Sequence, residues 1–177
     1  LTNFTSNLPL VVIDTLGQTI PDGHKIGAYG VFLNTNTPTG RTSLSGAANY
    51  VGRLGIGLHG SSSLGFPKKP YTIELDDEND DGLDWPLLGL PAGSDWVFHS
   101  SYSDKSLLNN FLTYELFESM GHYSVRRKYF ELFLRSHPGP LTASDYQGVY
   151  VLVEHIRIAN NRVNIAELDA TDNTAPV

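Results

Sequence analysis

Two stretches of alternating residues, joined by a short polar loop, place the strongest limit on how this chain can fold. In residues 50–58 every second position, from Tyr50 to Leu58, is apolar or glycine, and residues 69–75 repeat the pattern up to Leu75. A period of two is typical of a β-strand with one face turned inward. The glycines within 50–58 are costly in a strand and indicate a bulge or a close approach to the backbone. The sequence therefore predicts a strand–loop–strand unit.

The rest of the chain predicts more strands and one helix. Short strands are expected at 8–14, 28–33, 96–100, 128–134, 149–155 and around 163–165. Between 106 and 120 apolar residues recur at three- and four-residue steps, which is the stripe of an amphipathic helix: Leu107, Leu108, Phe111, Leu112, Leu116, Phe117 and Met120. We therefore expect one α+β domain over residues 1–177. It should hold a mainly antiparallel sheet of about six strands, with the helix packed on one face through Leu108, Phe111, Leu112 and Phe117.

Composition excludes several classes of protein. The chain has 177 residues with 12 Lys and Arg against 19 Asp and Glu, so its formal net charge is −7. This charge argues against a nucleic-acid partner, which needs a basic face. No stretch approaches the roughly 20 apolar residues that cross a bilayer. The chain has no cysteine, so it has neither disulfides nor thiol nucleophiles. Acidic, cysteine-free chains rich in Asn, Thr and Gly are common among bacterial surface proteins, which favours an extracellular location.

A serine-rich loop followed by two lysines is the first candidate for a functional site. Ser61, Ser62 and Ser63 are small enough for their backbone N–H groups to approach an anion, and Lys68 or Lys69 can supply positive charge. This layout is that of a nucleotide-phosphate clamp, although the GxxxxGK[ST] pattern of a Walker loop is absent. The alternative is a turn followed by two solvated lysines. Spacing leaves open which lysine faces a cleft.

An acidic loop is the second candidate. Residues 77–82 match the first six positions of a D-x-[DN]-x-[DN]-G calcium loop. Asp77, Asn79 and Asp81 would be oxygen ligands, and Asp84 can replace the glutamate that the motif expects at its twelfth position, where Leu88 stands. The alternative is an acidic turn in solvent.

The remaining titratable residues give weaker signals. The six histidines show no HxxxH or HxH spacing that would place two imidazoles on one metal ion. Glu154, near the end of a predicted strand, can orient a lysine or a metal ion, but a glutamate at such a position is most often a surface residue.

Several short blocks together resemble the CotH family, which is named for a spore coat protein. They keep the family's order from about residue 50 to residue 168. The blocks lie at 57–63 (GLHGSSS), 66–71 (FPKKPY), 87–91 (LLGLP), 94–97 (SDWV), 104–108 (DKSLL) with Asn110, 130–133 (FELF), 147–150 (QGVY) with Glu154, and 161–163 (NRV).

The resemblance implies a secreted or spore-associated bacterial protein kinase with a kinase-like ATP cleft. The loop of Ser61 to Ser63 would cover the phosphates of ATP, Lys68 or Lys69 would contact them, and Glu154 would lie near the junction of the two lobes. Phosphoryl transfer also needs Mg²⁺. The family's metal-binding aspartates are expected in a segment that follows residue 177, so we expect this chain to be an N-terminal fragment, inactive alone. Its partners would be a protein substrate and the remainder of the parent chain.

Two departures from the family support a second hypothesis. His59 and Asn109 stand where the family usually has arginine, so two fixed positive charges are absent. The alternative function is a non-catalytic extracellular surface or assembly module. It would bind a neighbouring surface protein and use the acidic loop as a structural Ca²⁺ site.

Overall fold

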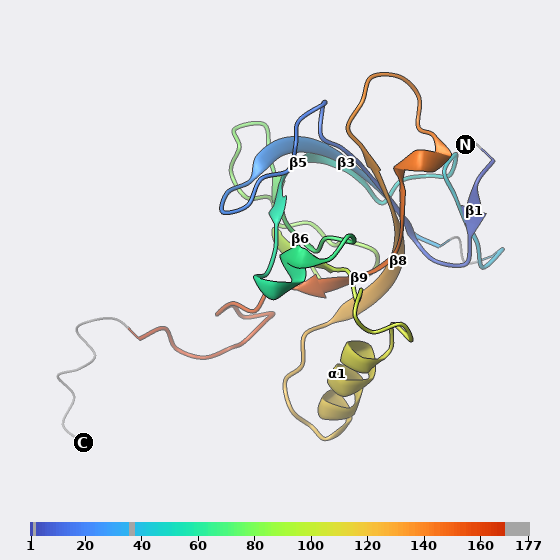
Figure 1. Cartoon of the computed structure of the whole chain (residues 1–177). Helices are drawn as coiled ribbons and strands as arrows, with labels where there is room; N and C mark the ends of the chain where they lie inside the picture. The colour runs from blue at the N-terminus through green and yellow to red at the C-terminus, as the bar shows by residue number, and fades with distance from the viewer. Residues whose placement is uncertain (2, 36–37, 169–177) are drawn as a thin grey trace, which may run out of the picture.

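The centre of the protein is a closed β-barrel (Figure 1), seen in a computed structural model that describes residues 1, 3–35 and 38–168. Its seven strands follow the order β2-β3-β5-β6-β7-β9-β8. Neighbouring strands are antiparallel except β2 and β8, which run parallel and close the barrel. The barrel strands are β2 (Leu10–Asp14), β3 (Ile26–Leu33), β5 (Tyr50–Leu58), β6 (Tyr71–Asp76), β7 (Asp95–His99), β8 (Arg127–Arg135) and β9 (Tyr146–Glu154).

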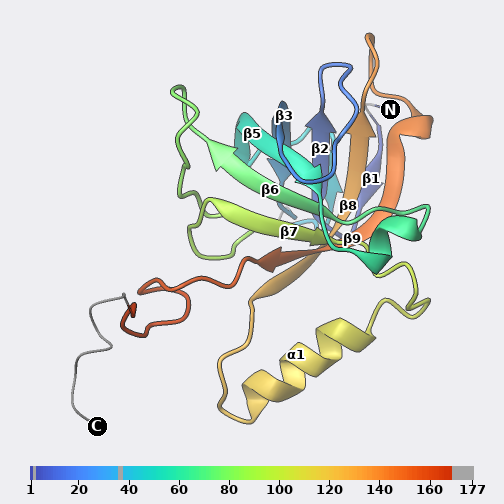
Figure 2. The same ribbon diagram turned by 60° about the vertical axis from the view of Figure 1, so that its left-hand side comes forward.

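Short elements lie around the barrel. Strands β1 (Thr5–Ser6) and β4 (Thr42–Ser43) pair with each other, and two 3-10 turns, η1 (Ser62–Gly65) and η2 (Ala143–Asp145), follow β5 and precede β9. The helix α1 (Asn109–Ser119) lies outside the barrel, as Figure 2 shows. No helix of the described part of the chain is long and apolar enough to cross a membrane.

The barrel interior is a packed apolar core. Its largest fully buried side chains are aromatic, and the rings of Phe98 and Phe130 meet edge to face with centroids 4.7 Å apart. Burying each large apolar side chain stabilises the fold by about 1.5–3 kcal/mol. The alternation in the sequence is visible here, since Leu54, Ile56 and Ile73 are fully buried. With the interior filled, a ligand can bind only at the barrel ends or on its outer surface.

A close backbone contact explains one of the strand glycines. A Cβ atom at Gly57 would lie 2.5 Å from the carbonyl oxygen of His24, which is closer than any side chain tolerates. The approach expected from the sequence therefore occurs between β5 and the segment that precedes β3.

The predicted α+β fold, with a principal helix packed on a sheet, is wrong. The sheet closes on itself because β2 pairs with β8, and no residue of α1 is buried. Leu108, Leu112 and Phe117, which were expected to face a core, are about half exposed.

Ion pairs and one aromatic stack explain which side α1 turns to the barrel. The guanidinium of Arg127, on β8, is almost fully buried and pairs with Glu115 and Glu118. The Phe111 ring stacks on Tyr129 with centroids 4.5 Å apart and an interplanar angle of 12°. Positions 111, 115 and 118 share one side of a helix. Because a buried guanidinium needs charged partners, this side faces β8; it includes Phe111 of the predicted stripe, whereas Leu112, Leu116 and Phe117 stay exposed.

Candidate functional site

The serine loop leaves the end of β5 and turns back into β6. Ser61 and Ser62 are exposed, and Ser63 is half-buried in η1. Phe66, farther along the loop, stacks on Tyr102 with ring centroids 5.1 Å apart. This contact holds the serine loop beside the segment that leads from β7 to α1.

The side chain of Lys68 reaches from this loop to β9. Its Nζ atom donates a hydrogen bond to the carbonyl oxygen of Val149 and lies 4.4 Å from the centre of the Tyr150 ring. Burial, reinforced by the positive charge of Lys105, lowers the pKa of Lys68. Among the described residues, no carboxylate lies within salt-bridge distance of Lys68 or Lys105. Uncompensated positive charge therefore gathers beside the serine loop.

Lys69 points elsewhere. Its Nζ atom donates a hydrogen bond to the carbonyl oxygen of Leu64, within η1. Lys69 is one of the residues that line a cavity at one end of the barrel, together with Leu58 and Tyr71. The structure thus separates the two lysines that the sequence left equivalent.

A cavity of about 290 Å³ lies against the outer face of β7 and β9. It is lined by His59, Val97, His99, Tyr114, Val125, Val153, Glu154, His155 and Ile156. Nε2 of His99 lies 3.0 Å from Nδ2 of Asn110, so α1 contributes to the rim. Most of the wall is apolar, with imidazole groups at its edge.

Burial and nearby positive charges weaken the basicity of two of these histidines. Burial, then the charge of His155, lowers the pKa of His59. Burial, then the charges of His59 and Lys68, lowers the pKa of His99. Sequence analysis missed this group because histidines on separate strands have no fixed spacing. The available signal was that alternation puts His99 on the face of Val97 and His155 on the face of Val153. Because β7 and β9 are antiparallel and Val97 pairs with Val153, the two histidines lie on either side of this valine pair.

Glu154 is fully buried at the end of β9. One carboxylate oxygen lies 2.5 Å from Nε of Arg126 and also accepts a hydrogen bond from Arg162, while the other accepts a hydrogen bond from the backbone N–H of Arg126, 3.1 Å away. The Arg162 side chain is only 1% exposed. Glu154 lines the histidine cavity, but its charge is matched by these two arginines rather than by Lys68.

The acidic loop forms hydrogen bonds within itself. Oδ1 of Asp77 accepts hydrogen bonds from the backbone N–H groups of Asn79 and Asp81, at 2.7 and 3.1 Å, and these bonds lower the pKa of Asp77. Asp84 turns away and pairs with Arg157 at 3.1 Å. Within the described ranges, no three carboxylate or imidazole side chains converge in a way that could hold a metal ion. Calcium binding by this loop stays a prediction.

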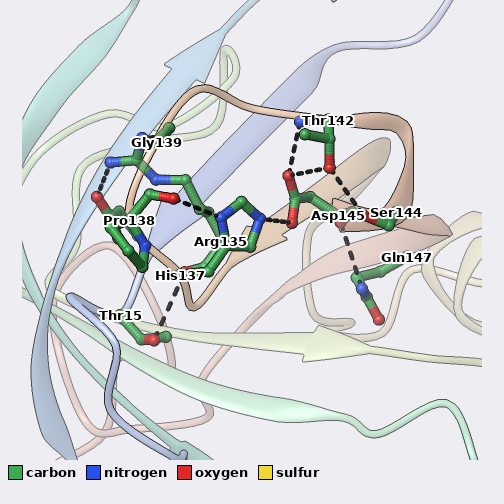
Figure 3. A network of polar contacts seen from close by, with 10 residues as sticks. Thr15, Arg135, His137, Pro138, Gly139, Thr142, Ser144, Asp145 and Gln147 are labelled. Atoms are coloured by element: carbon green, nitrogen blue, oxygen red, sulfur yellow. Dashed lines mark hydrogen bonds and ion pairs between the residues drawn. The ribbon is translucent and has the colours of Figure 1, made fainter.

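A polar network joins β8 to η2 (Figure 3). Nε2 of His137 lies 2.9 Å from Oδ1 of Asp145, and Oδ2 of Asp145 accepts a hydrogen bond from the backbone N–H of Thr142 at 2.7 Å. The Pro138 carbonyl and the Asp145 carboxylate raise the pKa of His137. Hydrogen bonds from Thr142 and His137 outweigh burial and lower the pKa of Asp145. Sequence analysis did not single out this pair, since the residues lie eight apart across a loop.

Comparison with known proteins supplies the family. The sequence model of the family described as CotH kinase protein matches residues 56–174. The chain belongs to this family. The matched range contains the serine loop, both lysines, the acidic loop and Glu154. No curated protein sequence matches the CotH chain.

Proposed function

We propose that this CotH chain provides the nucleotide-clamping portion of a secreted protein kinase that phosphorylates serine or threonine residues of a protein. The proposal depends mainly on the half-buried ammonium group of Lys68, which has no carboxylate partner among the described residues. A partly desolvated cation without an anionic partner is costly, and a phosphate group would offset that cost.

The groups around Lys68 suit a phosphate. The ammonium uses one of its three donors on the Val149 carbonyl, so two donors are left for an anion. Lys105 adds a second positive charge nearby. The exposed Ser61 and Ser62 can donate hydroxyl and backbone hydrogen bonds from the facing loop.

The histidine cavity suits the base of the nucleotide. Val97, Val125 and Val153 form an apolar wall and Tyr114 offers an aromatic ring, which is the kind of lining that holds a flat heterocycle. The positive charge of Lys68 reaches His99 at the edge of this cavity. Base and phosphate sites are therefore neighbours.

The described residues do not fit a magnesium site. Kinases hold Mg²⁺ with carboxylate and amide ligands, whereas Glu154 is committed to Arg126 and Arg162 and no acidic cluster faces Lys68 within the described ranges. The function proposed for this chain is thus nucleotide binding, with phosphoryl transfer in the full-length parent.

Isothermal titration calorimetry with ATP, with and without Mg²⁺, tests the proposal. We expect ATP binding to the chain and a loss of at least about tenfold in affinity, or about 1.4 kcal/mol, in Lys68→Ala. Lys128→Ala is the matched control, because Lys128 is an exposed lysine on β8. No heat with ATP, or equal affinities for the two variants, would contradict the proposal.

The parent protein gives a second test. Incubated with γ-labelled ATP and a protein mixture, the parent should label serine or threonine residues, and its Lys68→Ala variant should not. Recovery of the parent from the culture medium or the cell surface of a bacterial host would support the proposed extracellular location. Labelling that does not depend on Lys68 would remove this lysine from the function.

A further inference from the structure

One end of the barrel contains a cavity that is separate from the histidine cavity. It has a volume of about 400 Å³ and lies where β2 and β8 end and β6 begins. Its lining residues come from the β2–β3 loop, the end of β5, the start of β6 and the segment before it, and the end of β8 and the residue after it: Thr15, Gly17, Gln18, Thr19, Ile20, Leu58, Lys69, Tyr71, Leu134 and Ser136. No residue is shared with the histidine cavity. We call this space the barrel-mouth cavity.

The lining of the barrel-mouth cavity combines an apolar surface with hydrogen-bond donors. Leu58, Tyr71 and Leu134 provide the apolar part. Lys69 is the only charged lining residue, and among the described residues its ammonium has one carbonyl partner and no carboxylate within salt-bridge distance. Thr19, on the β2–β3 loop, is an exposed lining residue, so its hydroxyl group is accessible to a ligand. These donors suit an anionic group.

The walls of the cavity are held in place by polar contacts. Thr15 is fully buried; its backbone N–H donates to the carbonyl oxygen of Arg135 at 3.0 Å, and its hydroxyl donates to the carbonyl oxygen of Gln18 at 2.8 Å. Arg135 also forms a salt bridge with Asp14. Thr15 and Arg135 lie together in Figure 3. The β2 and β8 sides of the mouth are therefore fixed before any ligand arrives.

We propose that the barrel-mouth cavity binds a small monocarboxylate with an apolar body. The carboxylate would accept hydrogen bonds from the Lys69 ammonium and the Thr19 hydroxyl, and the apolar body would lie against Leu58 and Leu134. A single cation matches a single negative charge, whereas a triphosphate needs several cations. Cavities of this volume hold compact organic molecules. The inference does not depend on the proposed nucleotide function, because Lys68 lies against β9.

Ligand-observed NMR with benzoate as the probe tests this site. Saturation transfer should reach the benzoate ring, and a titration should give an affinity at least tenfold higher than that of benzyl alcohol, which has the same ring without the charge. Lys69→Met should weaken benzoate binding at least tenfold, and the matched control Lys128→Met, at an exposed lysine on β8, should leave it unchanged. If Lys69→Met does not fold, as judged by circular dichroism, Thr19→Val takes its place, with an expected loss of at least threefold.

Three results would overturn the inference: no saturation transfer to benzoate, equal affinity for benzyl alcohol, or unchanged affinity in the folded variant that is tested. Addition of ATP gives a separate readout. Benzoate should stay bound in the presence of ATP, and displacement would show that the two ligands share one site. Failure of ATP to bind would refute the proposed function alone, since benzoate binding does not require it.

Discussion

Replacing Glu154 by glutamine should destabilise the protein strongly. The Glu154 side chain is 0% exposed and that of Arg162 is 1% exposed, so the substitution leaves a guanidinium buried without its counter-charge. Two nitrogen atoms of Arg162 already lack a hydrogen-bond partner among the described residues, and burial lowers the pKa of this arginine. Breaking such a pair costs about 3–5 kcal/mol.

Chemical denaturation in urea, with calorimetric melting as a second readout, measures this loss. For a chain of this size each kcal/mol changes Tm by about 2–4 °C, so a decrease of about 6–20 °C is expected. Asp80→Asn is the matched control. Asp80 pairs with Arg53 at the surface, where the side chain of Asp80 is 70% exposed and that of Arg53 is 43% exposed. Exposed pairs of this kind contribute about 0–1 kcal/mol to stability.

A double variant separates the effect of the unpaired charge from the effect of the changed side-chain shape. Glu154→Gln combined with Arg162→Met removes the carboxylate and the almost fully buried guanidinium, and leaves Arg126, whose side chain is 31% exposed. It should recover a substantial part of the stability lost in the single variant, because no fully buried charge is left unpaired. A loss of unfolding free energy below about 1 kcal/mol in Glu154→Gln would contradict the prediction. Strict additivity of the two single-variant losses in the double variant would also contradict it, because it would show that Glu154 and Arg162 are not energetically coupled.

Three further predictions follow from the fold. The pKa of His137 is raised above 6.5, so its pairing with Asp145 contributes stability that is complete below pH 6.5 and is lost as the pH rises through the folded pKa. Parallel curves of stability against pH for the unsubstituted chain and the His137→Gln variant would contradict this. Phe111→Ala should cost about 0.5–1.5 kcal/mol for the aromatic stack plus a partial burial contribution, and a loss above about 3 kcal/mol in urea denaturation would indicate a fully buried ring. Gly57→Ala should lower Tm because the new Cβ would meet a backbone oxygen at 2.5 Å, whereas Gly65→Ala, with no atom within 4 Å, should not.

Local patterns in the sequence predicted the strands better than their assembly. The alternation from Tyr50 to Leu58 and from Tyr71 to Leu75 corresponds to β5 and β6, because a period of two depends only on neighbouring residues. Closure of the barrel depends on β2 pairing with β8, two strands far apart in sequence. No turn motif or residue spacing in the sequence indicates that β2 and β8 pair, so an open sheet was expected.

The face of the helix was mispredicted for a related reason. The leucine stripe of α1 indicates amphipathicity, and a stripe is ordinarily buried. The decisive residue is Arg127, which is nearly buried on β8 and pairs with Glu115 and Glu118. Alternation along a strand does not indicate that an arginine will be buried. The orientation of the helix, with Phe111, Glu115 and Glu118 toward β8, therefore could not be predicted from the sequence.

The candidate site was predictable where it depends on one loop. Because the serine loop and the two lysines are close in sequence, they are also close in the fold. The histidine cavity was not predictable, since His59, His99 and His155 line one cavity because β5, β7 and β9 belong to one closed sheet. The pairing of Glu154 with Arg126 and Arg162 likewise needs three separate segments to meet.

Barrel closure gives the two adjacent lysines different surroundings. In an open sheet either face can border a cleft, so neither lysine was preferred. In a closed sheet one face is the packed interior, and a ligand reaches inward residues only at the ends. Lys69 has the inward parity of Tyr71, and its carbonyl oxygen accepts a hydrogen bond from the Tyr150 hydroxyl at 2.9 Å, which fixes it at the mouth. Lys68 is held against β9 instead. Two ligands can therefore use neighbouring lysines without competing, and the benzoate and ATP titrations measure whether they do.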